Sequence, residues 1–292
     1  MLMRRFFLFL LSVFLLVVIC FLVWLMAPDF QLISSPNRIG VLEVRGLIDN
    51  VQESLKAIKE FRQDTNVKCI LVRIESPGGG IGASQELYRE VRRTIEEKPV
   101  VASLGGIAAS GGYYIASAAN RIVANPGTIT GSIGVISYFP NLRELFEKIG
   151  FSATTIKSGR FKDTGNPGRE MTPEERDLLQ ATMDQAHGQF IRDVARGRNL
   201  PEEKVREIAD GRIIMGESAQ QLGLVDELGN FEDGVKAAAK LGKIEGEPNL
   251  LYAKKKKRSL LDFLFGSELS EQLDGYVNGS LNFLRYQVPY WP

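Results

Sequence analysis

The fold is decided by the stretch CILVRIESPGGG, residues 69–80, in which a short apolar strand runs directly into a glycine-rich turn. Strands of the same kind occur at 39–44, 100–104 and 121–124, and helical patterns lie between them. Strands that alternate with helices across short glycine-rich turns indicate a mainly parallel sheet covered by helices. We therefore predict an α/β fold.

The expected helices follow from apolar side chains that recur at helical spacing. Their ranges are 48–61, 83–97, 108–119, 142–149, 172–198, 201–209, 216–222 and 231–241. The longest one opens with Thr172 and Pro173, and Glu175 stands three residues after the threonine, which is typical of a capped helix start. Two further strands are expected at 134–138 and 153–156, and the absence of an internal repeat favours one catalytic domain.

The N-terminal segment differs from the rest of the chain. Residues 6–26 carry no charge and, as a helix, are long enough to cross a hydrocarbon core of about 30 Å. A cleavable signal peptide would have a shorter apolar core and a small-x-small cleavage site, which this segment lacks. A lipoprotein signal ending at Cys20 would need a small residue where Ile19 stands. We therefore expect a transmembrane helix over 6–26.

The charges around this helix predict its orientation. Arg4 and Arg5 lie in the short segment 1–5, and positive charges favour the cytoplasmic side. Residues 27–37 resemble a linker, and everything after them would lie on the extracytoplasmic (periplasmic) side of the cytoplasmic (inner) membrane.

The overall composition excludes several classes of function. A net charge of +1 argues against a general affinity for nucleic acid. The two cysteines, Cys20 and Cys69, provide neither a disulfide framework nor the spacing of a metal site. His187 is the single histidine, so a histidine-rich metal site is impossible. No metal or other cofactor is expected.

Three glycine-rich turns, 76–80, 109–112 and 128–134, each follow an apolar strand. Ligands of open α/β folds collect at the carboxyl ends of strands, so these turns together predict a site lined by backbone N–H groups. Each turn taken alone could equally be a simple tight turn. Gly78 or Gly79, together with Gly111, could place N–H donors around a tetrahedral oxyanion.

Ser110 is the candidate nucleophile, because its small neighbours leave the hydroxyl open and it lies near a helix N-terminus. Its alternative role is that of an ordinary N-cap. His187, inside the long helix, is more typical of a structural residue. Lys157 and Lys162 are better placed to be the base, although either could be a solvated surface charge. Ser132 could hydrogen-bond such a lysine or could be a turn serine.

Several segments together resemble one family. They are Ser76–Gly80, Ala108–Tyr114, Ala124–Gly134, Lys157–Asp163, Arg169–Thr172, Gly211–Arg212 and Leu222–Asp226. In this order and spacing, from about 38 to 242, the chain is similar to signal peptide peptidase A in its short, single-domain bacterial form.

The resemblance implies a Ser/Lys-dyad serine endopeptidase on the fold shared by the Clp proteolytic subunit and the crotonases, a repeated ββα spiral over residues 38–244. Matched by motif, Ser110 is the nucleophile, Lys162 the general base and Ser132 the partner that orients the lysine. The resemblance also implies ring-shaped homo-oligomers in which the serine and the lysine can come from adjacent subunits. The implied substrates are remnant signal peptides and other apolar peptide segments at the membrane.

Two rival functions remain open. A crotonase-like enzyme would act on acyl-CoA, although an exported location argues against a cytoplasmic cofactor. A non-catalytic membrane scaffold would keep the fold for assembly alone. The segment 245–292 lies outside the resemblance, and its basic run 254–258 is either solvated or contacts anionic lipid or a neighbouring subunit.

Overall fold

The computed structural model describes residues 10–19, 37–253 and 285–287. The chain divides into two units, Met1–Ser35 and Pro36–Pro292. In the first unit, residues 10–19 form a helix, and the rest of the predicted span 6–26 lies outside the described residues, as do the segment 1–5 and most of the linker 27–37. Within the described ranges, no helix combines the length and the apolar character needed to cross a membrane.

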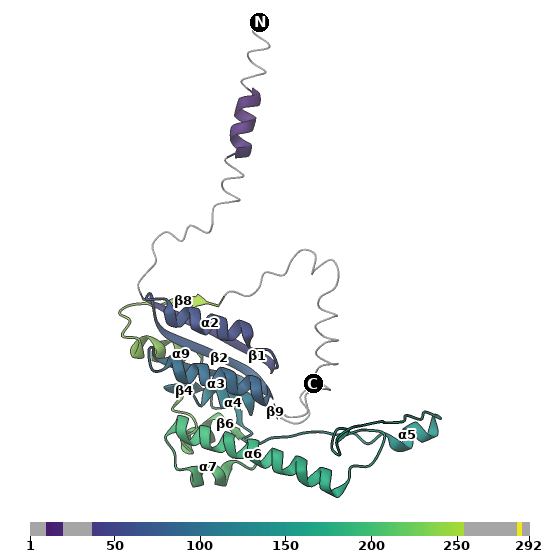
Figure 1. Ribbon diagram of the computed structural model, residues 1–292. Helices are drawn as coiled ribbons and strands as arrows, with labels where there is room; N and C mark the ends of the chain where they lie inside the picture. Colours follow the sequence, from purple (N-terminus) through teal and green to yellow (C-terminus); the bar gives the residue numbers. More distant parts are fainter. Residues whose placement is uncertain (1–9, 20–36, 254–284, 288–292) are drawn as a thin grey trace. The chain divides into compact units, whose positions relative to one another are not determined.

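The second unit is built on a mainly parallel sheet (Figure 1). Its parallel centre runs in the order β1 (Arg38–Ile48), β2 (Val67–Gly80), β3 (Val100–Ala108) and β4 (Arg121–Ala124). β8 (Asn249–Tyr252) extends the sheet beside β1, and β7 (Glu227–Leu228) extends it beside β4. β5 (Ile129–Gly131) pairs in parallel with the end of β3 at Ile107 and antiparallel with β6 (Ile213–Met215). The predicted α/β class is confirmed.

Alternate residues of the central strands pack into two different cores. Ile39, Leu71 and Val101 join a cluster under α9 (Phe231–Leu241), which covers one face of the sheet. Their neighbours, such as Ile70 and Ala102, belong to a larger cluster on the other face. Side chains alternate across a strand, so strands covered on both faces are apolar throughout. This double burial explains the continuous apolar runs in the sequence.

Three helices pack on the other face: α2 (Gln52–Gln63), α3 (Ile81–Thr94) and α4 (Gly111–Ala116). They confirm the predicted helices, but with shifted starts. α2 begins at Gln52 rather than at residue 48, because β1 continues through Ile48, which pairs with Gly79 of β2. α4 begins after Ser110 rather than at residue 108, because Ala108 still pairs with Ser76 of β2.

The glycines at 78–80, which were predicted to form a turn, lie in a strand instead. Gly78, Gly79 and Gly80 are the last residues of β2. A Cβ at Gly79 would lie 2.3 Å from the carbonyl oxygen of Ile48. Strand β1 can therefore lie this close to β2 only because residue 79 is glycine. The strands are therefore longer than their apolar parts.

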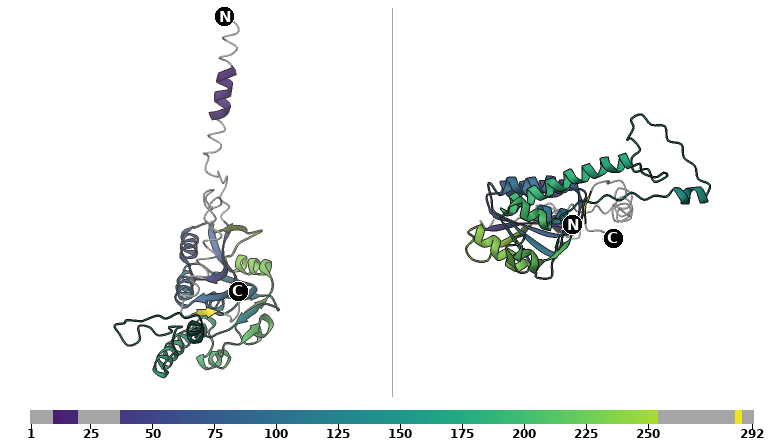
Figure 2. Two further views of the ribbon diagram at one scale, coloured as in Figure 1. Left: turned by 90° about the vertical axis from the view of Figure 1, so that its right-hand side faces the viewer. Right: turned by 90° about the horizontal axis from the view of Figure 1, so that it is seen from below.

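The segment 135–172 projects from the sheet as an arm (Figures 1 and 2). It contains α5 (Arg143–Lys148), a predicted helix that buries none of its residues. The strands expected at 134–138 and 153–156 do not form, so this prediction was wrong. Both segments have apolar side chains, but Ile156 is 96% exposed, and among the described residues the two segments contain no more than one isolated bridge residue, Ile136.

The remaining helices are close to their predicted ranges. α6 (Pro173–Arg198) leads from the arm back to the sheet (Figure 2) and is followed by α7 (Glu202–Ile208) and α8 (Gly216–Gln221). α6 begins with the predicted capping box: the Glu175 N–H donates to Thr172 Oγ1 at 3.2 Å, and the Thr172 N–H donates to Glu175 Oε2 at 2.9 Å.

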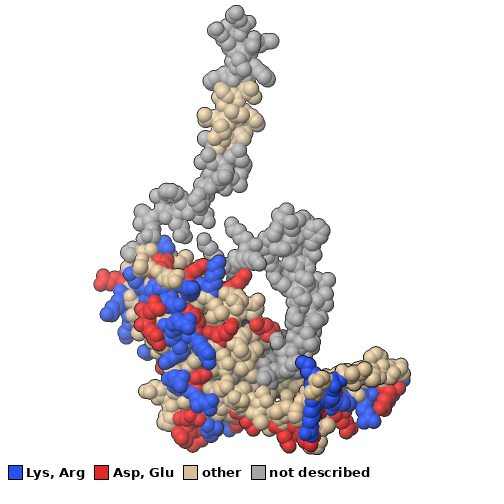
Figure 3. Space-filling model, in the orientation of Figure 1, with Lys and Arg blue, Asp and Glu red and all other residues tan. Residues whose placement is uncertain are grey.

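Two strands lie beyond residue 244, where the sequence suggested a tail. β8 pairs in parallel with β1 over Arg38–Val41. β9 (Arg285–Gln287) pairs antiparallel with the end of β2. The basic run 254–258 lies outside the described residues. On the face drawn in Figure 3, basic and acidic side chains are interspersed without an extended area of one sign.

Candidate active site

The three glycine-rich segments meet at the carboxyl ends of β2 and β3. The Ala109 N–H donates to the carbonyl oxygen of Ser76 at 3.1 Å, which joins the first segment to the second. The Ser110 N–H donates to the carbonyl oxygen of Gly131 at 2.8 Å, which joins the second to the third. These two hydrogen bonds join residues that are 33 and 21 positions apart in the sequence.

Ser110 has an unusual backbone conformation at the start of α4. Its φ of 52° and ψ of −117° lie in a backbone region that residues other than glycine rarely adopt. This conformation costs about 1–3 kcal/mol. Its side chain makes no capping hydrogen bond, so the structure does not support the alternative role as an ordinary N-cap. A strained serine on a sharp strand-to-helix turn is the geometry of a nucleophile elbow.

The hydroxyl of Ser110 is buried and has no partner. The residue is 0% exposed, and Oγ forms no hydrogen bond within the described part of the chain. A buried hydroxyl without a partner costs free energy, which is typical of a group kept for chemistry rather than for stability.

The three glycines predicted as oxyanion donors differ in their surroundings. Gly111 is the first residue of α4, and its N–H finds no backbone acceptor among the described residues. The Gly78 N–H donates to Ser76 Oγ at 3.1 Å, and Gly78 has a φ of 111°. Gly79 pairs with Tyr286 of β9. Gly111 is therefore the candidate donor next to Ser110 in the sequence, and no hydrogen bond engages its N–H within the described part of the chain.

Close packing holds this site together. A Cβ at Gly112 would lie 2.9 Å from the carbonyl oxygen of Ser76, so α4 can approach the end of β2 only because this residue is glycine. The hydroxyl of Thr130 donates to the carbonyl oxygen of Ala108 at 2.7 Å and is fully buried.

Ser132 lies next to the residue that binds Ser110. It follows Gly131, whose carbonyl accepts the Ser110 N–H, and its own N–H donates to the carbonyl oxygen of Arg212 at 2.9 Å. Ser132 is 4% exposed and has a φ of 49°. Ser110 and Ser132, the two predicted site serines, are therefore both buried and both at positive φ. Gly131 connects them, because it accepts the Ser110 N–H and directly precedes Ser132.

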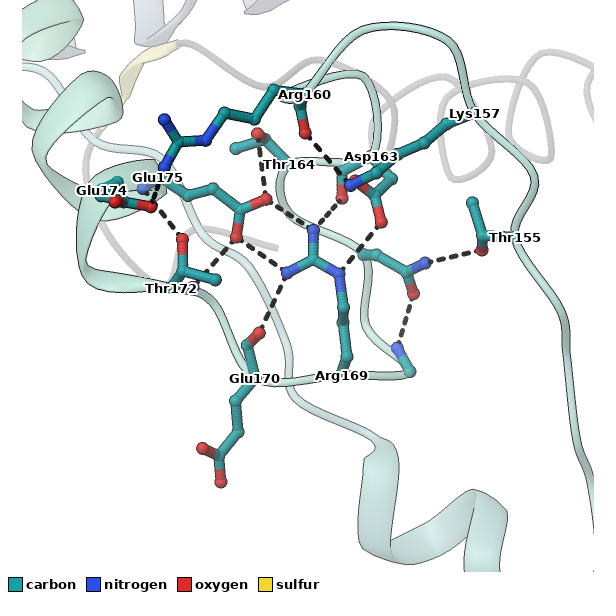
Figure 4. A network of polar contacts seen from close by, with 12 residues as sticks. Thr155, Lys157, Arg160, Asp163, Thr164, Arg169, Glu170, Thr172, Glu174 and Glu175 are labelled. Atoms are coloured by element: carbon teal, nitrogen blue, oxygen red, sulfur yellow. Dashed lines mark hydrogen bonds and ion pairs between the residues drawn. The ribbon is translucent and has the colours of Figure 1, made fainter.

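The two candidate lysines lie on the arm and have different surroundings. Lys157 forms an ion pair with Asp163, and its Nζ also donates to the carbonyl oxygen of Arg160 at 3.1 Å (Figure 4). Lys162 is exposed, and its side chain has no hydrogen bond or ion pair with any described residue. Lys157 is thus engaged as a cation. Neither lysine hydrogen-bonds Ser110 Oγ within this chain.

A network around Arg169 shapes the turn that carries Lys162 (Figure 4). Arg169 binds both carboxylate oxygens of Glu175, at 2.8 and 2.5 Å, and its Nε donates to Asp163 at 3.0 Å. These hydrogen bonds from Arg169, with a further one from the Thr172 N–H, lower the pKa of Glu175 to about 2. Arg169 and then Lys157 lower the pKa of Asp163 well below its usual range. Asp163 directly follows Lys162, so the network fixes the turn beside it.

Sequence reasoning assigned no role to Arg169 or Asp163. The capping box revealed Glu175 as a helix-start residue, but its pairing with Arg169 joins groups that no spacing rule connects. An acidic and a basic residue six positions apart in a loop form no local pattern that predicts such a network.

The structure gives the other candidates no catalytic contact. His187 lies within α6, and its Nε2 is buried without a hydrogen-bond partner in the described residues. Cys69 is buried and unpaired, and burial raises the pKa of its thiol to about 12. Within the described ranges no cluster of side chains could hold a metal ion.

A cavity of about 560 Å³ lies between the arm and the start of α6, lined by residues that include Tyr138, Phe139, Arg169 and Met183. None of the predicted catalytic residues lines it.

Comparison with known proteins adds a family match and several relatives. A model described as "Peptidase family S49" matches residues 92–245. A Synechocystis sp. protein described as "Putative protease" is 48% identical over 214 residues, 73% of this chain and 77% of that protein. The Enterococcus faecium "Putative signal peptide peptidase SppA" is 39% identical over 225 residues, 72% of this chain and 65% of that protein. The Arabidopsis thaliana "Serine protease SPPA, chloroplastic" is 36% identical over 237 residues, 80% of this chain and 35% of that protein.

Proposed function

The chain belongs to peptidase family S49, and we propose that it is a serine endopeptidase with Ser110 as nucleophile and Lys162 as general base. The observation that carries the proposal is the conformation of Ser110, a strained and buried serine whose hydroxyl has no partner at the start of a helix. One of the relatives is named a serine protease, which agrees with this assignment.

The proposed reaction is a two-step acyl transfer. Neutral Lys162 takes the proton from Ser110 Oγ as this oxygen attacks the carbonyl carbon of a peptide bond, and the lysine then gives the proton to the leaving amine. Backbone N–H groups of Gly111 and of Gly78 or Gly79 hold the oxyanion, and one such donor stabilises a transition state by about 2.7–4 kcal/mol. Water then releases the acyl group from Ser110.

A lysine serves as a base only when burial or a nearby cation lowers its pKa. Lys162 is exposed on the arm of this chain, so the proposal requires a surface that covers it. We assign that surface to an adjacent subunit of a homo-oligomeric ring, which would bring its own Ser110 and Ser132 to the lysine. Ser132, buried beside the Ser110 backbone partner Gly131, would then orient Lys162.

The proposed substrates are remnant signal peptides and other apolar peptide segments at the membrane. A relative from Enterococcus faecium is named as a signal peptide peptidase, which supports this class. The proposal includes the membrane anchor over 6–26, with the catalytic domain on the extracytoplasmic side and the repeated ββα spiral of the Clp and crotonase fold.

The test replaces Ser110 and the two lysines separately in the full chain and measures hydrolysis of an apolar reporter peptide. Ser110→Ala should lower kcat/KM by about 10⁴-fold or more, because the nucleophile is lost. Lys162→Arg should lower it by about 10²–10⁴-fold, because arginine stays charged and cannot act as the base.

Lys157→Arg is the matched control. It keeps a cation for Asp163 and should retain the activity of the unmodified chain. Loss of activity in the Lys157 variant with full activity in the Lys162 variant would reverse the assignment, and full activity in Ser110→Ala would overturn the serine mechanism.

A further inference from the structure

β3 bulges away from β2 shortly before the proposed nucleophile. The two strands pair in even register as far as Leu104 and pair again at Ala108. In between, the three residues 105–107 of β3 have a single counterpart on β2, Glu75. A bulge bends its strand, and bulges are frequent beside active sites, where they re-aim a side chain. The chain reaches Ser110 two residues after the pairing resumes.

The carboxylate of Glu75 lies in this bulge. The Gly106 N–H donates to Glu75 Oε2 at 3.0 Å and to Oε1 at 3.2 Å. A Cβ at Gly105 would lie 1.5 Å from Glu75 Oε1, so only glycine leaves room for the carboxylate there. Arg73 donates to the same Oε1 at 2.9 Å and to Ser103 Oγ at 3.0 Å. Arg73 thus holds the carboxylate, and the carboxylate holds the middle of the bulge.

The other edge of the bulge is tied to the third glycine-rich segment. Thr128 Oγ1 donates to the carbonyl oxygen of Gly105 at 2.6 Å. Ile107 pairs with β5, and β5 ends at Gly131, whose carbonyl accepts the Ser110 N–H. On the edge toward β2 the register is broken, and there the carboxylate supplies an acceptor in place of a strand partner.

Two adjacent residues of β2 hold the chain that leads to Ser110. Glu75 binds the bulge, and the carbonyl oxygen of Ser76 accepts the Ala109 N–H at 3.1 Å. A positive φ at a serine persists only where the surrounding contacts fix the backbone. We propose that Glu75 is a positioning residue for Ser110: its carboxylate keeps the bulge in the shape that directs the serine hydroxyl to the peptide bond. The inference rests on the proposed peptidase function.

Loss of the carboxylate should affect kcat rather than KM. Without it the Gly106 N–H loses its acceptor, and the bulge can relax and carry Ser110 with it. A displacement of a reacting group by about 1 Å can slow a reaction by about 10²-fold. An effect confined to the reacting atoms lowers kcat and kcat/KM together, whereas a loss of substrate binding raises KM.

The test compares Glu75→Met with Glu75→Gln in the full chain. Both side chains have nearly the length of glutamate, but only glutamine keeps an oxygen that can accept the Gly106 N–H. Glu75→Met should lower kcat for an apolar reporter peptide by about 10–10²-fold and leave KM within about two-fold. Glu75→Gln should recover most of kcat. An unchanged kcat in Glu75→Met, or the same loss in both variants, would overturn the proposal.

Asp226 provides the matched control, because it also joins an arginine to the backbone N–H of a strand. Asp226 Oδ2 accepts the Ile122 N–H of β4 at 2.6 Å, and Oδ1 accepts from Arg198 at 2.6 Å. Its side chain is 30% exposed, close to the 28% of Glu75. Asp226→Leu should lower the melting temperature but leave the kcat of the folded protein unchanged. A loss of kcat equal to that of Glu75→Met would show that general destabilisation is sufficient, which overturns the positioning role.

Amide hydrogen exchange tests the bulge without an activity assay. Residues 105–111 should exchange several-fold faster in Glu75→Met than in Glu75→Gln, and Asp226→Leu should leave this range unchanged. Equal exchange in the two Glu75 variants would overturn the proposed contact.

The two hypotheses fail in different ways. If Ser110→Ala hydrolyses peptides as the unmodified chain does, the proposed function fails, and the exchange of residues 105–111 still decides whether Glu75 holds the bulge. If hydrolysis depends on Ser110 but Glu75→Met keeps its kcat, only the inference about Glu75 fails.

Discussion

At the scale of single residues, Ser110 combines three properties that stability alone would not select. It is strained, it is buried, and its hydroxyl has no partner in the described chain. Each property costs free energy, and the surrounding contacts to Gly131 and Ser76 keep the conformation in place. The site therefore stores backbone strain at the residue whose hydroxyl is proposed to attack the substrate.

This strain can be measured with two substitutions that both remove the hydroxyl. Ser110→Gly relieves the positive φ, while Ser110→Ala keeps it. We expect the glycine variant to be more stable than the alanine variant by about 1 kcal/mol, after the larger unfolded-state entropy of glycine is subtracted. Urea unfolding of both variants provides the comparison, and an alanine variant as stable as the glycine variant would show that the backbone is not strained.

At the scale of elements, the arm depends on polar contacts rather than on a core. α5 buries none of its residues, whereas Arg169 ties Asp163 to Glu175 at the start of α6. The turn that carries Lys162 is held by this network, since its apolar neighbours are exposed. Arg169 is thus a positioning residue for the proposed base.

We predict that Arg169→Met loosens residues 157–175 while the sheet is unchanged. Amide hydrogen exchange should show lost protection in that range at neutral pH. Arg143→Met is the matched control, because it removes an exposed ion pair with Glu147 on the same arm and should change little. Equal protection in the Arg169 variant and the unmodified chain would contradict the role of the network.

The network also predicts a pH dependence. The pKa of Glu175 is lowered to about 2, first by Arg169 and then by the Thr172 N–H. A depressed carboxyl pKa stabilises the folded state above the unfolded value of about 4.3 and loses this effect as the pH falls through the folded value. Protection of residues 163–175, corrected for intrinsic exchange, should therefore hold from pH 7 to 5 and decline from pH 4 toward 2.

At the scale of the whole molecule, no hydrogen bond joins the proposed base on the arm to the proposed nucleophile within one chain. Lys162 is exposed, and Ser110 Oγ receives no hydrogen bond from it. Several large apolar side chains of the arm are exposed as well: Ile136, Tyr138, Leu145, Ile149, Phe151 and Ile156. Figure 3 shows uncharged side chains along one edge of the arm. An exposed apolar surface of this kind marks a contact site for a protein or a membrane, and the proposed homo-oligomer would cover it with another copy of the chain.

The proposal of a dyad formed between subunits predicts complementation. Ser110→Ala and Lys162→Ala chains should each be inactive alone, but a mixed assembly contains sites with an intact serine from one chain and an intact lysine from the other. Random mixing should restore about one quarter of the unmodified activity. Co-refolding in equal amounts, followed by a peptide assay, is the measurement. No recovery despite co-assembly would show that each chain completes its own dyad.

Local pattern by itself determined the α/β class, the apolar parts of four parallel strands and the capped start of α6. The apolar pattern of a buried strand and the capping residues of a helix each lie within a few neighbouring residues, so the sequence alone predicts them. The convergence of the three glycine segments followed from a general rule about strand ends, and the structure bears it out through the bonds of Ala109 and Ser110. The choice of Lys162 over Lys157 came from the family resemblance.

Only the tertiary structure decided the features that depend on distant partners. The glycines at 78–80 are strand rather than turn because β1 and β9 lie beside them. The apolar segments at 134–138 and 153–156 are not strands because, among the described residues, no strand pairs along them beyond a single bridge at Ile136. The strain of Ser110 and the engagement of Lys157 by Asp163 likewise arise from contacts that no local pattern encodes. A strand edge, a backbone held at positive φ and an ion pair each require a second segment, and its position is a property of the folded chain.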